Sequence, residues 1–193
     1  MSESSDDARP ADGPAGQQRT FVLIPGAGGT AWYWHRIVPL LHQAGHEAIA
    51  VDLPGDDPAA GLPEYTDLVI DAIGGRGNVV LVAQSLGAFT APLVAAKIPV
   101  ASLVFVNAMI PRPGETPGAW WGNTGWDGAR VAAAEQGGYG TEVDLAVYFL
   151  HDVPPDVAAA GEPYQRPEAD VLPGGHLIAL AQPARLAGYL LGA

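Results

Sequence analysis

Short apolar runs alternate with amphipathic segments over the first half of the chain. Four runs are rich in β-forming residues and are bordered by Gly, Pro or Asn, a pattern that predicts buried strands. They span residues 20–26, 46–55, 78–83 and 101–107. The segments between them have helical spacing and span residues 32–45, 66–73 and 86–97. We expect the second helix to begin at Thr66 and the third to be kinked at Pro92.

Strands and helices that alternate at this spacing predict an α/β fold, with a mostly parallel, doubly wound sheet covered on both faces. Ligands of such sheets bind beyond the carboxyl ends of the strands. Ser85, Asn107 and the glycine-rich loop 26–29 should all lie at that edge. This edge is therefore where we look for chemistry.

The pattern changes after residue 107. Residues 111–128 are rich in Pro, Gly and Trp, and residues 129–136 and 142–160 have helical patterns. We interpret residues 111–165 as a helical cap insertion over the sheet edge. The end of the chain, 169–193, predicts a short strand, a glycine-rich turn that carries His176, and a closing amphipathic helix.

Composition bounds the class of protein. The 193 residues suffice for one domain, which we place at 20–193, after a polar tail at 1–19 that we expect to be disordered. The formal charge of −12 argues against a nucleic-acid partner. Neither a secretory signal nor an apolar run of membrane-spanning length is present, so we expect a soluble cytoplasmic protein. With no cysteine and no metal-ligand spacing among its histidines, the chain is expected to hold no metal or cofactor.

Ser85 ends the third apolar run, in the pentapeptide Ala83-Gln84-Ser85-Leu86-Gly87. A serine at a tight strand-to-helix turn between small residues is the arrangement of a nucleophile elbow, usually G-x-S-x-G. Alanine in the first place adds only a methyl group. The backbone N–H of Leu86 would face an oxyanion above the serine. The alternative is that Ser85 is an ordinary helix N-cap.

Two further features favour the catalytic interpretation. The loop after the first strand, PGAGGTAWYW, can place a second N–H, that of Ala27, opposite that of Leu86. It lacks the last glycine of G-x-G-x-x-G and has no G-K-[ST], which argues against a phosphate loop. His176 follows Ser85 in the order expected of a Ser–His centre on this architecture. His35, His42, His46 and His151 are expected to be structural.

These motifs resemble the serine α/β-hydrolases, and most of all the branch of plant methylesterases, salicylate-binding esterases and hydroxynitrile lyases with their bacterial esterase-like relatives. The resemblance rests on residues 22–55, VLVAQSLGAF, FVNAMIPRPGE, YFLHDVPPDVA and PGGHLIALAQP, and covers nearly everything after the tail. It implies Ser85 as nucleophile, His176 as general base and acid, and the Ala27 and Leu86 N–H groups as oxyanion hole. It also implies the helical cap. Pro25 replaces a histidine common in the family, at a position where the backbone acts.

The chain departs from the family before its last motif. A strand and helix, followed by the catalytic Asp, are expected between the cap and His176, and this βα unit is missing. Three replacements for the acid stay open: Asp152, if residues 145–152 form a strand; Asn107, at the end of the fourth strand; and Asp170, six positions before His176. The shortening should also expose a sheet edge, unless the last strand moves beside the fourth or a second subunit covers it, and the second case would be a homodimer.

The sequence therefore predicts a hydrolase of small apolar carboxylic esters. The aromatic side chains of the insertion are candidates to line an apolar pocket, or they pack the cap against the core. These are Trp120, Trp121, Trp126, Tyr148 and Phe149. The missing acid keeps two alternatives open: a pseudo-hydrolase that only binds a small molecule, and a lyase on the same scaffold.

Overall fold

A four-stranded parallel sheet forms the centre of the molecule. The structure is a computed structural model that describes residues 17–166 and 183–192. The strands are β1 (Thr20–Ile24), β2 (Glu47–Ala50), β3 (Val79–Gln84) and β4 (Ser102–Val106), in the order β2-β1-β3-β4. Their pairing aligns the ends of β3 and β4, with Gln84 opposite Val106. The predicted parallel sheet is confirmed, and its carboxyl ends meet at one edge.

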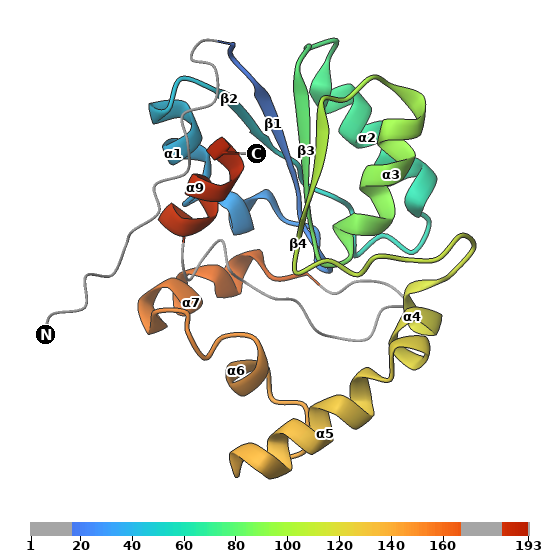
Figure 1. Ribbon diagram of the computed structural model, residues 1–193, viewed down its shortest axis with the longest axis vertical. Coiled ribbons are helices and arrows are strands. Elements are labelled where there is room, and N and C mark those ends of the chain that lie inside the picture. The colour runs from blue at the N-terminus through green and yellow to red at the C-terminus, as the bar shows by residue number, and fades with distance from the viewer. Residues whose placement is uncertain (1–16, 167–182, 193) are drawn as a thin grey trace, which may run out of the picture.

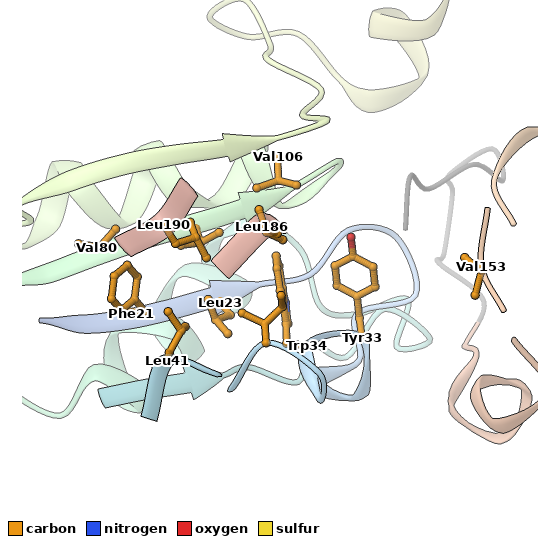
Figure 2. Close-up of a cluster of buried hydrophobic side chains, with 12 residues drawn as sticks. Phe21, Leu23, Tyr33, Trp34, Leu41, Val80, Val106, Val153, Leu186 and Leu190 are labelled. Atoms are coloured by element: carbon orange, nitrogen blue, oxygen red, sulfur yellow. The ribbon is translucent and has the colours of Figure 1, made fainter. Parts of the chain in front are cut away.

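Helices cover both faces of the sheet (Figure 1). On one face lie α1 (Val38–Gln43) and α9 (Pro183–Gly192), and on the other lie α2 (Leu62–Ile73) and α3 (Gly87–Lys97). Figure 2 shows Leu190 of α9 toward Val80 and Phe21, and Leu186 toward Val106 and Trp34, in one hydrophobic cluster. The closing amphipathic helix is thus confirmed, and it seals one side of the hydrophobic core.

The first predicted helix is in fact two elements. A 3₁₀ turn, η1 (Ala31–Trp34), precedes α1, which begins only at Val38. Pro39 lies in the first turn of α1, where its missing N–H has no helical partner to lose. In the predicted continuous helix 32–45, Pro39 would lie in the interior and would remove an internal hydrogen bond, which explains the break.

The predicted start of the second helix at Thr66 is wrong. Helix α2 begins at Leu62, with Pro63 in its first turn and the Gly61 N–H donating to the Glu64 carboxylate at 2.8 Å. Thr66 lies inside the helix, where its hydroxyl donates to the Leu62 carbonyl at 2.6 Å. The helix therefore begins four residues earlier than expected. Helix α3, by contrast, begins directly after the expected turn and is continuous through Pro92.

The insertion consists of short helical segments beyond the edge where the strands end (Figure 1). They are α4 (Pro117–Thr124), α5 (Trp126–Gly137), α6 (Leu145–Tyr148), α7 (Pro155–Gly161) and the 3₁₀ turn η2 (Glu162–Tyr164). The Asp144 carboxylate accepts from the Ala146 N–H at 2.8 Å and so caps α6. This helix rules out the strand interpretation of residues 145–152. None of the helices described is long and apolar enough to span a bilayer.

The two strands beside the expected site differ in burial. Every residue of β3 is buried, whereas Ser102, Leu103 and Val104 of β4 are only partly buried and Phe105 is 39% exposed. Within residues 17–166 and 183–192, no strand pairs with the outer side of β4. The exposed sheet edge expected from the shortened chain is therefore present in the described part of the structure.

Candidate active site

Ser85 occupies a strained turn between β3 and α3. Its φ of +47° lies in the left-handed region, where a residue with a side chain is uncommon. The surrounding backbone holds this conformation: the Ser85 N–H donates to the Val106 carbonyl at 3.1 Å, and the Ser85 carbonyl accepts from the Met109 N–H at 3.0 Å. Strain that is held by neighbouring structure is characteristic of functional sites.

Two glycines make room for the turn. A Cβ on Gly26 would stand 2.8 Å from the Ser85 Cβ, and a Cβ on Gly87 would stand 2.6 Å from the Pro25 carbonyl oxygen. Real Cβ atoms do not approach so closely, so the loop after β1 and the start of α3 meet only because both residues are glycine. Ala83 is fully buried within β3, so the first place of the pentapeptide accommodates its methyl group.

The serine does not cap α3. The N-cap of this helix is Leu86, and no side-chain hydrogen bond is made at the cap. Ser85 is 1% exposed, yet its hydroxyl forms no hydrogen bond to any residue in the described part of the chain. The structure thus disfavours the N-cap alternative, and no described residue is a hydrogen-bond partner of this hydroxyl.

The glycine-rich loop is fixed beside the serine. Gly29 has φ +55°, and its carbonyl accepts from the Leu53 N–H at 2.6 Å. The Asp52 carboxylate accepts from the Ala31 N–H at 2.8 Å. Ala27 packs against the hydrophobic cluster that contains Leu86. Among the described residues, neither the Ala27 nor the Leu86 N–H has a hydrogen-bond acceptor, so both remain available for a ligand.

A pocket of about 350 Å³ opens at Ser85, and three indoles of the cap form much of its wall. Its lining residues are Ser85, Asn107, Ala108, Met109, Trp120, Trp121 and Trp126. The rings of Trp121 and Trp126 meet edge to face, with centroids 4.7 Å apart. We call this space the aromatic pocket. Its size is in the range of small-molecule sites.

Two of the five aromatic residues considered from the sequence do not line the aromatic pocket. The Tyr148 hydroxyl donates to the Gly140 carbonyl at 2.9 Å, and Phe149 is buried within the cap. Met109 and Ala108 line it instead, since the chain turns back toward Ser85 after β4. Both residues follow closely after β4, which pairs with the strand that leads to Ser85, and this position in the sequence could have predicted their place in the pocket.

Arg130, which the sequence did not single out, supports the pocket wall from behind. Its guanidinium lies 5.2 Å from the Trp126 ring centroid and 5.6 Å from that of Tyr148. It also donates to the Thr141 carbonyl. The spacing of four residues between Trp126 and Arg130 on α5 brings them to one helix face.

The candidates for the acid lie in different settings. Asn107, with φ +44°, follows the end of β4 and lines the aromatic pocket beside Ser85. Its carboxamide makes no hydrogen bond to a described residue. Asp152 is exposed in a turn after α6 rather than at a strand end. His176 and Asp170 lie outside the described residues.

The remaining histidines have structural contacts or lie on the surface. His46 accepts from the Arg19 N–H at 3.2 Å, and His35 stacks on Trp32. His42 lies in the last turn of α1, and His151 is exposed. The described residues contain no cluster of side chains able to hold a metal ion.

The fold and this site define the class of protein. The model of the alpha/beta hydrolase family matches residues 21–190, and the chain belongs to that family. It is 36% identical over 110 residues to a probable esterase of Oryza sativa subsp. indica, PIR7A. This alignment covers 51% of this chain and 42% of the relative. It is also 36% identical over 111 residues to an alpha-hydroxynitrile lyase of Arabidopsis thaliana, covering 50% and 42%.

Among solved structures, polyneuridine aldehyde esterase is similar, with a TM-score of 0.60 and 23% identity over 79% of this chain and 69% of that one. At this identity the likeness shows the fold. The chain spans less than half the length of these two curated relatives in the alignments, which cover about half of this chain.

Proposed function

We propose that the protein hydrolyses small carboxylic esters. The Ser85 hydroxyl attacks the acyl carbonyl while His176 takes its proton, and the Ala27 and Leu86 N–H groups hold the oxyanion. His176 then protonates the leaving alkoxide, and water releases the acyl group from Ser85. The substrate is a small, largely apolar ester, because no charged side chain lines the described part of the aromatic pocket.

One observation carries the proposal: Ser85 lies in a strained turn that lines the aromatic pocket, and no described residue accepts from or donates to its hydroxyl or accepts from the N–H groups of Ala27 and Leu86. A structural serine at this position would cap α3, and Ser85 does not. The names of the relatives, which include esterases and a methylesterase, agree with the proposed reaction.

The orienting group for His176 is proposed to be Asn107. It lies beside Ser85 in the aromatic pocket, and its carboxamide has no hydrogen-bond partner among the residues that the structure describes. An amide can hydrogen-bond an imidazole but supplies no charge to stabilise the imidazolium. In serine proteases, the loss of the acid costs about 10⁴ in kcat, and the remaining machinery retains about 10³ over water. We therefore expect a slow esterase.

The test is hydrolysis of p-nitrophenyl acetate by the purified protein, Ser85→Ala and His176→Ala. We expect both variants to lose at least about 10²-fold in kcat, with unchanged far-UV circular dichroism. A fluorophosphonate should label Ser85 in the wild type only. A folded wild type that is neither faster than Ser85→Ala nor labelled would overturn the proposal.

That negative outcome would favour a pseudo-hydrolase that binds a small molecule. The specific observation behind this alternative is the absence of a carboxylate among the described residues of the aromatic pocket. A ligand bound equally well by the wild type and Ser85→Ala would support it. The lyase alternative rests on the hydroxynitrile lyase relative, but the described pocket lining offers no charged group to bind a leaving cyanide.

We also propose that two copies associate through the exposed edge of β4. Unpaired strand edges that carry apolar residues tend to pair with another chain, and Leu103 and Phe105 lie on this strand. Light scattering should give a dimer mass that Phe105→Glu reduces to that of a monomer. A monomeric wild type would contradict this part of the proposal.

A further inference from the structure

A second pocket lies on the other side of the nucleophile turn. Its volume is about 370 Å³, and it is formed by the start of α2, the start of α3 and the loop after β1. Its lining residues include Leu53, Leu62, Tyr65, Leu86, Thr90 and Gly118. We call this space the aliphatic pocket. It does not include Ser85 or any of the three indoles.

The two pockets share their dividing wall. Leu86, Phe89 and Met109 form a small hydrophobic cluster, against which Leu62, Trp120 and Trp121 pack. Leu86 and Leu62 face the aliphatic pocket, whereas Met109 and the two indoles face the aromatic pocket. Helix α4 also borders both, with Pro117 and Gly118 on one side and the indoles on the other.

Ser85 and Leu86 therefore stand at the junction of the two pockets. Ser85 lines the aromatic pocket and Leu86, the next residue, lines the aliphatic one. A carbonyl carbon at the Ser85 hydroxyl, with its oxygen toward the Leu86 N–H, has two remaining substituents that must leave in different directions. The two pockets provide those two directions.

The chemistry of the aliphatic pocket fits an uncharged chain. Among the residues that the structure describes, no charged side chain lines it. Part of its floor is the backbone of Gly26 and Gly87, where a Cβ would collide with Gln84 and Pro25. The Thr116 hydroxyl at its rim is engaged by the Ala119 N–H at 3.2 Å. Leu53, Leu62 and Leu86 line the space together with the side chains of Tyr65 and Thr90, and its surface is mostly apolar, so it favours the burial of an apolar chain.

We propose that the substrate carries a planar aromatic group on one side of its ester carbonyl and an aliphatic chain on the other, bound in the aromatic and aliphatic pockets respectively. This inference rests on the proposed function for the place of the carbonyl. The inference goes beyond the proposed function, because it assigns a subsite for the aliphatic chain of the substrate that the reaction at Ser85 does not require.

The test uses alkyl phenyl ketones, which carry a ring, a carbonyl and a chain but cannot be hydrolysed. Binding of acetophenone, butyrophenone and hexanophenone to the full chain is measured by titration calorimetry. A buried methylene contributes about 0.8 kcal/mol, or about fourfold in Kd. From acetophenone to hexanophenone, four methylenes should tighten binding on the order of 10²-fold.

Gly118→Leu narrows the aliphatic pocket without a clash, because a Cβ at this position has no atom within 4 Å. It should reduce the acetophenone-to-hexanophenone ratio of Kd values to less than about tenfold. Gly122→Leu is the matched control: it lies on the same helix, is equally open, and lines neither pocket. This control should retain the wild-type ratio.

Gly61→Leu narrows the pocket from α2, where a Cβ would be at ordinary contact distance of 3.6 Å from the Glu64 carboxylate. Gly61→Leu should lower the ratio of Kd values as Gly118→Leu does. Because Gly61 lies outside α4, agreement of the two variants would exclude a local change in α4 as the cause. A wild-type ratio near one, or equal ratios in Gly118→Leu and Gly122→Leu, would overturn the inference. Since binding is measured without turnover, a protein that binds with this pattern but hydrolyses no ester would refute only the proposed function.

Discussion

The sheet half of the molecule, residues 20–107, and the cap insertion, residues 111–165, contribute to the same site by different means. In the sheet half, every residue of β1 and β3 is buried, and the turn at Ser85 is enclosed by backbone on several sides. In the cap, α4 has no buried residue and α5 has only Ala134. The cap is held by aromatic contacts and by exposed hydrogen bonds such as that from Asn123 to Glu115.

The two regions therefore have different tasks: the sheet half positions the Ser85 turn, and the cap provides the pocket walls that fit the substrate. The nucleophile turn must hold a strained conformation, which only a densely packed region can over-determine. The pocket walls must fit a substrate, and aromatic side chains on small helices can be exchanged without loss of the core. We therefore expect substitutions in the two regions to differ in size and in kind.

The largest effect on stability should come from the core of the sheet. Leu81 is fully buried in β3, and Leu81→Ala should lower the free energy of unfolding by about 2–5 kcal/mol. Val147→Ala in α6, where the side chain is 41% exposed, should change it by less than about 0.5 kcal/mol. Urea unfolding monitored by circular dichroism measures both. Equal losses would show that the cap is as tightly packed as the sheet.

A methyl group added at two glycines should act in opposite directions. Gly87→Ala would place a Cβ 2.6 Å from the Pro25 carbonyl oxygen and should destabilise the protein by about 1–3 kcal/mol, with loss of esterase activity. Gly122→Ala in α4 meets no atom within 4 Å and should stabilise by about 0.5–1 kcal/mol. Thermal melts and ester hydrolysis of both variants test this. A neutral Gly87→Ala would mean that the turn can relax.

Asn107 lies between the two regions, and its substitution tests how the missing acid is replaced. Aspartate tolerates a positive φ as asparagine does, so Asn107→Asp should fold normally. If Asn107 orients His176, the added carboxylate should raise kcat at neutral pH about tenfold or more. The gain should disappear in the Ser85→Ala background. An unchanged or slower Asn107→Asp would place the orienting group elsewhere.

The smallest effect concerns the anchor of α4. The pKa of Glu115 is lowered, first by the hydrogen bond from the Asn123 side chain and then by that from the Arg112 N–H. A lowered folded-state pKa means that this stabilisation is present above the unfolded value of 4.5 and is lost as pH falls through the folded value. The difference in Tm between the wild type and Glu115→Gln should therefore shrink as the pH is lowered below about 4.5. A difference that is constant with pH would contradict the assignment.

Some elements were predictable because their cause is local. The four apolar runs indicate the strands, since short runs of β-forming residues bordered by Gly, Pro or Asn are typical of strands in a covered parallel sheet. The turn at Ser85 was predictable because it needs small neighbours at fixed positions. The start of α2 was missed: the helix was expected to begin at Thr66, whereas it begins at Leu62, after the hydrogen bond from the Gly61 N–H to Glu64. Competing local signals of this kind are resolved by the packing of the whole helix.

The sequence alone determined the order of strands and helices, the serine at the end of β3 and the glycines that make its turn possible, because steric and hydrophobic rules act between near neighbours in the chain. Only the tertiary structure decided which cap residues meet that serine. Trp120, Trp121 and Trp126 face it while Tyr148 and Phe149 do not, and a second pocket opens between α2, α3 and α4. These contacts join segments far apart in the sequence, and their geometry depends on how whole helices pack.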